Sequence, residues 1–170
     1  NWRKTSNGNP EKIGIMHPKK PIKVKLFSGI IFSDKETLNK ITNLLKKKYG
    51  EIDFISEEYP FNFTDYYEDE MGKNLKKLFI SFKKLINREK LAEIKLATNK
   101  IEDNHTKKNN RIINLDPGYL TLHNVVLASA KEMPHKVYIG KGMFGDVALI
   151  YKKRNTIISI THSLISELKK

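Results

Sequence analysis

Two helical patterns of apolar residues, each placed between strand-like runs, restrict the folds open to this chain more than any other feature. The apolar positions are Leu38, Ile41, Leu44, Leu45 and Tyr49 in the first pattern, and Leu91, Ile94, Ala97 and Ile101 in the second. Such spacing puts apolar side chains on one face of a helix. The runs 23–32, 52–55, 75–85 and 111–115 are rich in β-branched and aromatic residues, which is typical of strands. The predicted order is therefore β-α-β-β-α-β.

This order matches the split β-α-β, ferredoxin-like arrangement, in which two helices pack on one face of an antiparallel sheet. The first helix is expected to begin at a capping box, Ser33-Asp34-Lys35-Glu36, and to end at Gly50. Thr121 is expected to cap a short helix through residues 125–127. The predicted strands of a C-terminal antiparallel β-meander are 136–139, 146–152 and 156–160. The fold class is therefore α+β, with a ferredoxin-like core, a short helix and this meander.

A length of 170 residues suits one domain with a hydrophobic core. Residues 1–20 contain glycine, prolines and many polar groups, so they predict a flexible arm. Alternatively, residues 1–15 are sequence added ahead of a natural start at Met16. Residues 21–170 are expected to form a single α+β domain.

The composition also restricts the class of protein. The chain has no cysteine, which excludes disulfides and thiolate metal sites. No apolar run reaches the roughly 18 residues that a membrane-spanning helix needs, so no membrane partner is expected. No basic start followed by an apolar segment is visible, and we therefore predict a cytoplasmic location.

The formal net charge of +13 is a further constraint, because a basic surface is typical of proteins that bind nucleic acid. However, only four of the 32 basic residues are arginine, the residue best suited to planar phosphate recognition. The lysines are spread over predicted helices and turns alike. The charge is therefore either a set of solvated faces or a surface that attracts anions.

The segment Asp116-Pro117-Gly118 carries the strongest local signal for a candidate site. Proline followed by glycine predicts a type II turn after the strand 111–115. Such a turn would hold the Asp116 carboxylate and the Tyr119 phenol at the end of a strand, where sites are often built. Asp116 either stabilises the turn by accepting backbone N–H bonds or serves as a general base or a ligand for Mg²⁺.

Two further segments offer polar groups at suggestive positions. Residues 58–72 are dense in aromatic and acidic side chains, and Tyr66, Tyr67 and Glu70 either lie in a solvated turn or supply a polar site. On the second helix, Lys95, Thr98, Asn99 and Glu102 form a row at helical spacing. This row is either a salt-bridged, exposed helix face or a face turned toward a cleft. In a cleft, Lys95 would hold an anion and Glu102 would orient it.

The region around residue 140 gives weaker signals. His135 and Lys136 precede a strand on which Lys136 and Tyr138 point to one side. A basic and aromatic strand face suits phosphate or base contacts, and an exposed sheet face would look the same. The spacing Gly140-x-Gly142-x-x-Gly145 resembles a dinucleotide fingerprint, but strands are predicted on both sides where a helix should follow. It therefore predicts a tight hairpin loop.

Several motifs occur together along the chain. They are Lys25-Leu26-Phe27, Phe63-Thr64-Asp65-Tyr66-Tyr67, Glu70-Met71-Gly72, Lys95 with Thr98-Asn99 and Glu102, Asn114-Leu115-Asp116-Pro117-Gly118-Tyr119-Leu120, and His135-Lys136-Val137-Tyr138-Ile139-Gly140. With them, residues 21–151 resemble an uncharacterised prokaryotic family, domain of unknown function 4416. The resemblance implies no assigned activity. The family usually has Trp-Thr-Tyr-Pro near its end, where this chain has Ile160-Thr161-His162-Ser163.

The leading hypothesis is a polar cleft for a small anionic ligand, nucleotide-like or phosphorylated, with or without chemistry. Its candidate catalytic residues are Asp116, Glu70 and His135. Its candidate ligand-binding residues are Tyr66, Tyr67, Lys95, Asn99, Glu102, Tyr119, Lys136 and Tyr138. Two alternatives remain: a basic RNA- or DNA-binding module, although Phe79 and Phe82 fall on opposite faces of their strand, and a protein-interaction domain that pairs through the meander.

Overall fold

A large antiparallel sheet runs through the computed structural model, which describes residues 17–62, 67–107, 110–152 and 156–159. Within these residues the sheet has nine strands in the order β11-β10-β8-β7-β1-β4-β2, with β3 paired to β4 and β9 paired to β10. The strands are β1 (Val24–Phe32), β2 (Ile52–Ile55), β3 (Tyr59–Pro60), β4 (Lys76–Ile86), β7 (Ile113–Leu120), β8 (Asn124–Ser129), β9 (Val137–Gly140), β10 (Met143–Lys152) and β11 (Thr156–Ser159).

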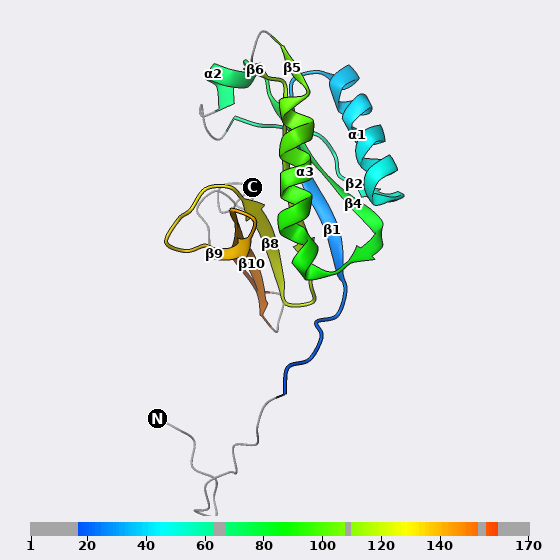
Figure 1. Cartoon of the computed structure of the whole chain (residues 1–170). Coiled ribbons are helices and arrows are strands. Elements are labelled where there is room, and N and C mark those ends of the chain that lie inside the picture. Colours follow the sequence, from blue (N-terminus) through cyan, green and yellow to red (C-terminus); the bar gives the residue numbers. More distant parts are fainter. Residues whose placement is uncertain (1–16, 63–66, 108–109, 153–155, 160–170) are drawn as a thin grey trace, which may run out of the picture.

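Three helices and a small hairpin complete the described part of the chain. They are α1 (Lys35–Tyr49), α2 (Glu68–Met71), α3 (Leu91–Asp103), which follows a 3₁₀ turn at Arg88–Lys90, and the two-stranded sheet of β5 (Thr106–Lys107) and β6 (Asn110–Arg111). The two long helices, α1 and α3, cover the same face of the sheet (Figure 1). In the described ranges, no helix is both long and apolar enough to cross a membrane.

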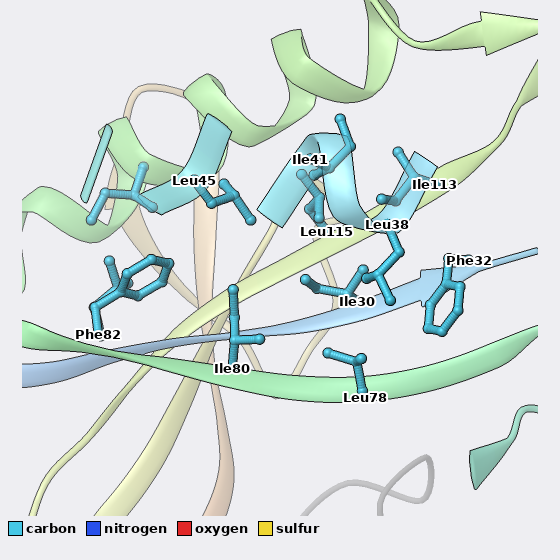
Figure 2. Packing of buried hydrophobic residues seen from close by; sticks show 12 residues of the cluster. Ile30, Phe32, Leu38, Ile41, Leu45, Leu78, Ile80, Phe82, Ile113 and Leu115 are labelled. Carbon is cyan, nitrogen blue, oxygen red and sulfur yellow. The ribbon is translucent and has the colours of Figure 1, made fainter. Parts of the chain in front are cut away.

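The main core lies between these helices and the central strands. Figure 2 shows α1 side chains directed at those of β1 and β4. The cluster consists of Leu26, Ile30, Phe32, Leu38, Ile41, Leu45, Leu78, Ile80, Phe82, Ile94, Ile113 and Leu115. Each such side chain contributes about 1.5–3 kcal/mol when it is fully removed from water. This cluster fixes α1 and α3 on the sheet.

The predicted helices and strands up to residue 103 are found close to their expected bounds, and the α+β class is confirmed. Two details of the first helix differ. Its N-cap is Asp34, not Ser33, because the Asp34 carboxylate accepts a 2.7 Å bond from the Thr37 amide. Leu44 is 39% exposed and stays outside the core. Gly50 ends the helix with a φ of 102°, as expected.

The order of the whole sheet differs from that of a four-stranded ferredoxin-like sheet. Strands β8, β10 and β11 extend it beyond β7, which makes β7 an interior strand. The C-terminal strands predicted as a meander therefore belong to the main sheet.

The predicted turn at Asp116-Pro117-Gly118 is wrong, because β7 runs straight through it. Asp116 and Gly118 lie opposite residues of β1, and Gly118 has no positive φ. Glycine is needed there for space: a Cβ would stand 2.5 Å from the Val126 carbonyl oxygen. Pro117 has no N–H to offer a second neighbour, and β8 pairs with β7 only from Gly118 onward.

The short helix predicted after Thr121 is also wrong, since strand β8 occupies residues 124–129. The Thr121 hydroxyl accepts bonds from the amides of His123 and Asn124, at 3.0 and 2.9 Å, and so stabilises the turn between β7 and β8. The following valines favour a strand, because branching at Cβ suits the pleated sheet. Val126 and Ala128 are buried against Leu91 of α3.

The expected hairpin near residue 140 is present, but its loop is shorter than predicted. Lys141 and Gly142 both have positive φ, 55° and 73°, between β9 and β10. Positive φ at both central residues is the signature of a type I′ turn. Strands therefore flank this segment on both sides, and no helix N-terminus is available for a dinucleotide.

At the N-terminal side of β1, residues 17–23 form no regular element, and the rest of the predicted arm lies outside the described residues.

Candidate functional site

A polar pocket lies where the sheet opens between β7 and β8. β8 pairs with β7 only at Gly118–Leu120, and the earlier part of β7 has no β8 partner. The pocket has a volume of about 460 Å³. It is lined by Tyr67, Glu70, Lys95, Asn99, Glu102, Asp103, Thr106, Arg111, Asn114, Asp116, Ala130 and Lys131.

Side chains of α3 take the place that a neighbouring strand would fill. The Leu115 amide donates to Glu102 Oε1 at 2.7 Å, and Lys95 Nζ donates to the Leu115 carbonyl at 2.6 Å. Buried backbone groups need partners, and Leu115 is fully buried without a β8 residue beside it. Lys95 and Glu102, only 7% and 4% exposed, therefore have a structural role at the opening of the sheet.

Ion pairs extend from these two side chains into the pocket. Lys95 Nζ lies 3.9 Å from Glu102 Oε1 and 3.6 Å from Asp116 Oδ1. The other oxygen of Glu102 accepts a 3.0 Å bond from Arg111 Nη1. Asn114 links the two ends of this chain of charges, because it accepts from Arg111 Nη1 at 3.1 Å and donates to Asp116 Oδ2 at 2.9 Å.

Arg111 also holds the short helix α2 at the pocket. Its Nε and Nη2 donate to the two oxygens of Glu70 at 2.7 and 2.6 Å, a bidentate contact. This contact lowers the pKa of the Glu70 carboxyl and raises the pKa of Arg111. At Glu102, burial raises the pKa, while Lys95, the Leu115 amide and Arg111 oppose that shift.

The pocket is close to electrically balanced although the chain is strongly basic. Its lining contains the four carboxylates Glu70, Glu102, Asp103 and Asp116, and the three cations Lys95, Arg111 and Lys131. With all of these ionised, the lining carries one negative charge. Lys95 and Arg111 are already engaged by carboxylates. The pocket therefore offers hydrogen-bonding groups of both kinds and no strong excess of positive charge.

Six of the sequence-predicted site residues lie together in this lining. They are Tyr67, Glu70, Lys95, Asn99, Glu102 and Asp116. Of the two interpretations of the polar row on the second helix, the cleft-facing one describes Lys95 and Glu102. Asp116 enters the lining from a continuous strand and not from a turn.

The remaining predicted residues are placed elsewhere. The Tyr119 ring lies 6.0 Å from the Arg88 guanidinium, by the Leu91 cluster. The others follow β8 in the chain. His135 Nε2 lies 3.8 Å from Asp146 Oδ2, Lys136 donates to Ser129 Oγ at 2.9 Å, and the Tyr138 ring contacts Phe144. None of these four lines the pocket, and Tyr66 lies outside the described residues.

Arg111 and Asn114 are the main site residues that sequence reasoning missed. Asn114 and Asp116 are two residues apart in a strand, between apolar neighbours, so their side chains share one face. This alternation was a usable signal, but the proline and glycine that follow favoured a turn instead. Arg111 had only its rarity as a signal, since it is one of four arginines in the chain.

The expectation of Mg²⁺ finds no support in the geometry. Across the described ranges, no three or more His, Cys, Asp or Glu side chains are placed to hold one metal ion. Three of the four pocket carboxylates, Glu70, Glu102 and Asp116, face Lys95 or Arg111 instead of a common centre.

Comparison with known proteins identifies the family. A family model described as Domain of unknown function (DUF4416) matches residues 22–162. Comparisons with curated proteins and with solved structures gave no match. The matched segment covers most of the chain and includes every residue of the pocket lining. The chain therefore belongs to the DUF4416 family.

Proposed function

We propose that the pocket binds a small polar ligand and that Asp116 accepts a hydrogen bond from a hydroxyl or amino group of that ligand. The carrying observation is the position of this carboxylate. Its side chain is 34% exposed, its Oδ2 is held by Asn114, and its Oδ1 lies 3.6 Å from Lys95. Each carboxylate oxygen has two lone pairs, so acceptor capacity remains on a group that is already oriented.

The size and lining of the pocket support this proposal. A volume of about 460 Å³ falls in the range of small-molecule sites, which span about 300–1,000 Å³. Asn99 adds a carboxamide from α3, and Tyr67 adds an aromatic ring with a hydroxyl. A ligand that matches this lining has several hydrogen-bonding groups and little apolar surface.

The prediction of an anionic ligand from the sequence has to be made more specific. The Lys95 and Arg111 charges are paired with carboxylates, so an anion must compete with those groups. A nucleotide-like or phosphorylated ligand would therefore bind through its hydroxyl groups more than through charge alone. Catalysis is not part of the proposal, because His135 stands outside the lining and both oxygens of Glu70 are engaged by Arg111.

The nucleic-acid alternative has less support. Phe79 and Phe82 do lie on opposite sheet faces, with Phe82 in the helix-covered core. Phe27 is near Phe79, but it is only 7% exposed and cannot offer a ring face to a base. Lys25, which lies on the same face of β1 as Phe27, is ion-paired with Asp53.

A ferredoxin-like unit inside the larger sheet is a further part of the proposal. The antiparallel order β7-β1-β4-β2 and the position of α1 and α3 on one face support this description. In that unit, the pocket forms at the outer side of β7, beside α3.

Binding can be tested by calorimetry and thermal denaturation with sugars, polyols, amino acids, nucleotides and phosphorylated metabolites. A ligand at a hundredfold excess over its Kd stabilises the fold by about 2.7 kcal/mol. We expect at least one class to bind wild type and the control Glu51→Gln, whose exposed carboxylate pairs with Lys83 away from the pocket. The same compound should bind Asp116→Asn at least tenfold more weakly. Equal affinity for wild type and Asp116→Asn would refute the proposal.

A further inference from the structure

We propose that the Glu70 carboxylate is an internal stand-in for the carboxylate of a ligand, and that the ligand class is a small hydroxy or amino acid. This inference rests on the proposed binding function of the pocket. It adds which end of the ligand meets Arg111 and which end meets Asp116.

The Arg111 guanidinium is fixed from one side and recognises an anion on the other. Nη1 is held by Glu102, whose side chain is only 5% exposed, and by Asn114. The Nε–Nη2 edge faces the two oxygens of Glu70. This edge has the spacing that arginine uses to bind carboxylates in proteins and ligands alike. The arrangement is therefore a preorganised carboxylate site with Glu70 bound in it.

Glu70 differs from Glu102 in the ease with which it can leave. Its side chain is 38% exposed and comes from the four-residue helix α2. The adjacent Met71 is buried with Ile31 and Leu75, and this contact anchors α2 independently of the ion pair. Glu70 can therefore rotate into water while α2 stays in place, and a competing carboxylate would make the same bidentate contact with Arg111.

The second end of the ligand follows from Asn114. Its carboxamide accepts from Arg111 Nη1 and donates to Asp116 Oδ2, so the anion site on the Nε–Nη2 edge and the acceptor site are joined through the guanidinium and one carboxamide. A ligand that binds both has a carboxylate at one end and a hydroxyl or amino group further along its chain. Its donor would meet Asp116, and its carboxylate would replace that of Glu70 on Arg111.

The test compares wild type, Glu70→Gln and the control Glu51→Gln with three probes: lactate, its neutral amide lactamide, and glycerol 3-phosphate. NMR titration of the full chain gives the affinities. The chain has only four arginines, so the Arg111 Nε–Hε signal can be assigned by its loss in Arg111→Lys. Loss of the Glu70 charge should shift this signal, and lactate should shift it back toward its wild-type position.

We expect Glu70→Gln to bind lactate about tenfold more tightly than wild type, because the probe no longer competes with an attached carboxylate. Lactamide should show no such gain, and Glu51→Gln should behave like wild type. Equal lactate affinity in Glu70→Gln and wild type would overturn the inference. A gain for glycerol 3-phosphate alone would also overturn it, because the site would then select phosphate.

The two proposals fail in different ways. If other compounds bind in an Asp116-dependent manner while Glu70→Gln changes no affinity, only the stand-in role of Glu70 is refuted. If no compound distinguishes wild type from Asp116→Asn, the proposed binding function itself is refuted.

Discussion

Lys95→Met is the most direct test of the side chains that replace a strand beside β7. Methionine keeps most of the apolar volume of lysine and removes the ammonium group. The variant loses the 2.6 Å bond to the Leu115 carbonyl and the ion pairs to Glu102 and Asp116. Burial of the Lys95 side chain, 8% exposed, means that water cannot readily replace these contacts.

The size of the expected loss in the free energy of unfolding depends on the contacts that remain after the substitution. One hydrogen bond from a charged donor contributes about 1.5–3 kcal/mol, and removing one member of a buried ion pair costs about 3–5 kcal/mol. Glu102 would keep Arg111 and the Leu115 amide as partners, which limits the cost. We therefore expect the free energy of unfolding to fall by about 2–4 kcal/mol.

Urea denaturation measures this change, and Lys90→Met is the matched control. Lys90 also pairs with a glutamate, Glu93, but both side chains are about half exposed. An exposed pair contributes little, so the control should lose less than about 0.5 kcal/mol. The reasoning would be refuted if the two variants lost similar stability with unchanged denaturant slopes.

Two more predictions concern packing and pH. Gly118→Ala should lower the free energy of unfolding by about 1–3 kcal/mol, and more than Gly29→Ala. At Gly118 the new Cβ meets a backbone carbonyl at 2.5 Å, whereas at Gly29 it meets an aromatic side chain at 3.2 Å. Equal losses in urea denaturation would contradict this. The Glu70 pKa is lowered from 4.5 by Arg111, so their pair stabilises the fold above that value and is lost as pH falls through the folded pKa. The melting temperature of Glu70→Gln should therefore fall less between about pH 5 and about pH 3 than that of wild type. If the two melting temperatures fell in parallel, the Glu70–Arg111 pair would not be the source of this pH dependence.

The sequence predicted the elements whose pattern is local. The stripe of Leu38, Ile41 and Leu45 repeats at helical spacing, and these three side chains are buried. The alternation of Leu78, Ile80 and Phe82 likewise predicted the inner face of β4, where all three are buried. Periodicity was sufficient because these side chains recur at the spacing of one helix or strand face, and that face packs into the main core.

Elements that depend on distant contacts were not predictable in this way. Asp116-Pro117-Gly118 has the local preference of a turn, but pairing with β1 keeps it extended. Gly118 is required by the approach of Val126, a contact that no local pattern reveals. Thr121 has the preference of a helix cap, yet it stabilises a tight turn because β8 pairs back on β7.

The candidate site was predictable in composition and not in geometry. The row of Lys95, Asn99 and Glu102 has the same spacing on an exposed helix and on one that faces a cleft. The choice depends on the separation of β8 from β7, which leaves Leu115 without a β8 partner. The contact of Arg111 with Glu70 joins residues 41 positions apart and has no signature in either segment.

The contacts of Lys95 and Glu102 with Leu115 also occupy backbone groups on which another chain could otherwise pair. A strand with an unpaired amide and carbonyl is a template on which another chain can add. Here the part of β7 ahead of Gly118 has no β8 partner, and Pro117 removes only one donor from that side of the strand. Two side chains of a helix occupy those backbone groups instead. Protection against intermolecular pairing therefore depends on two polar residues of α3, and their loss would affect colloidal stability as well as folding.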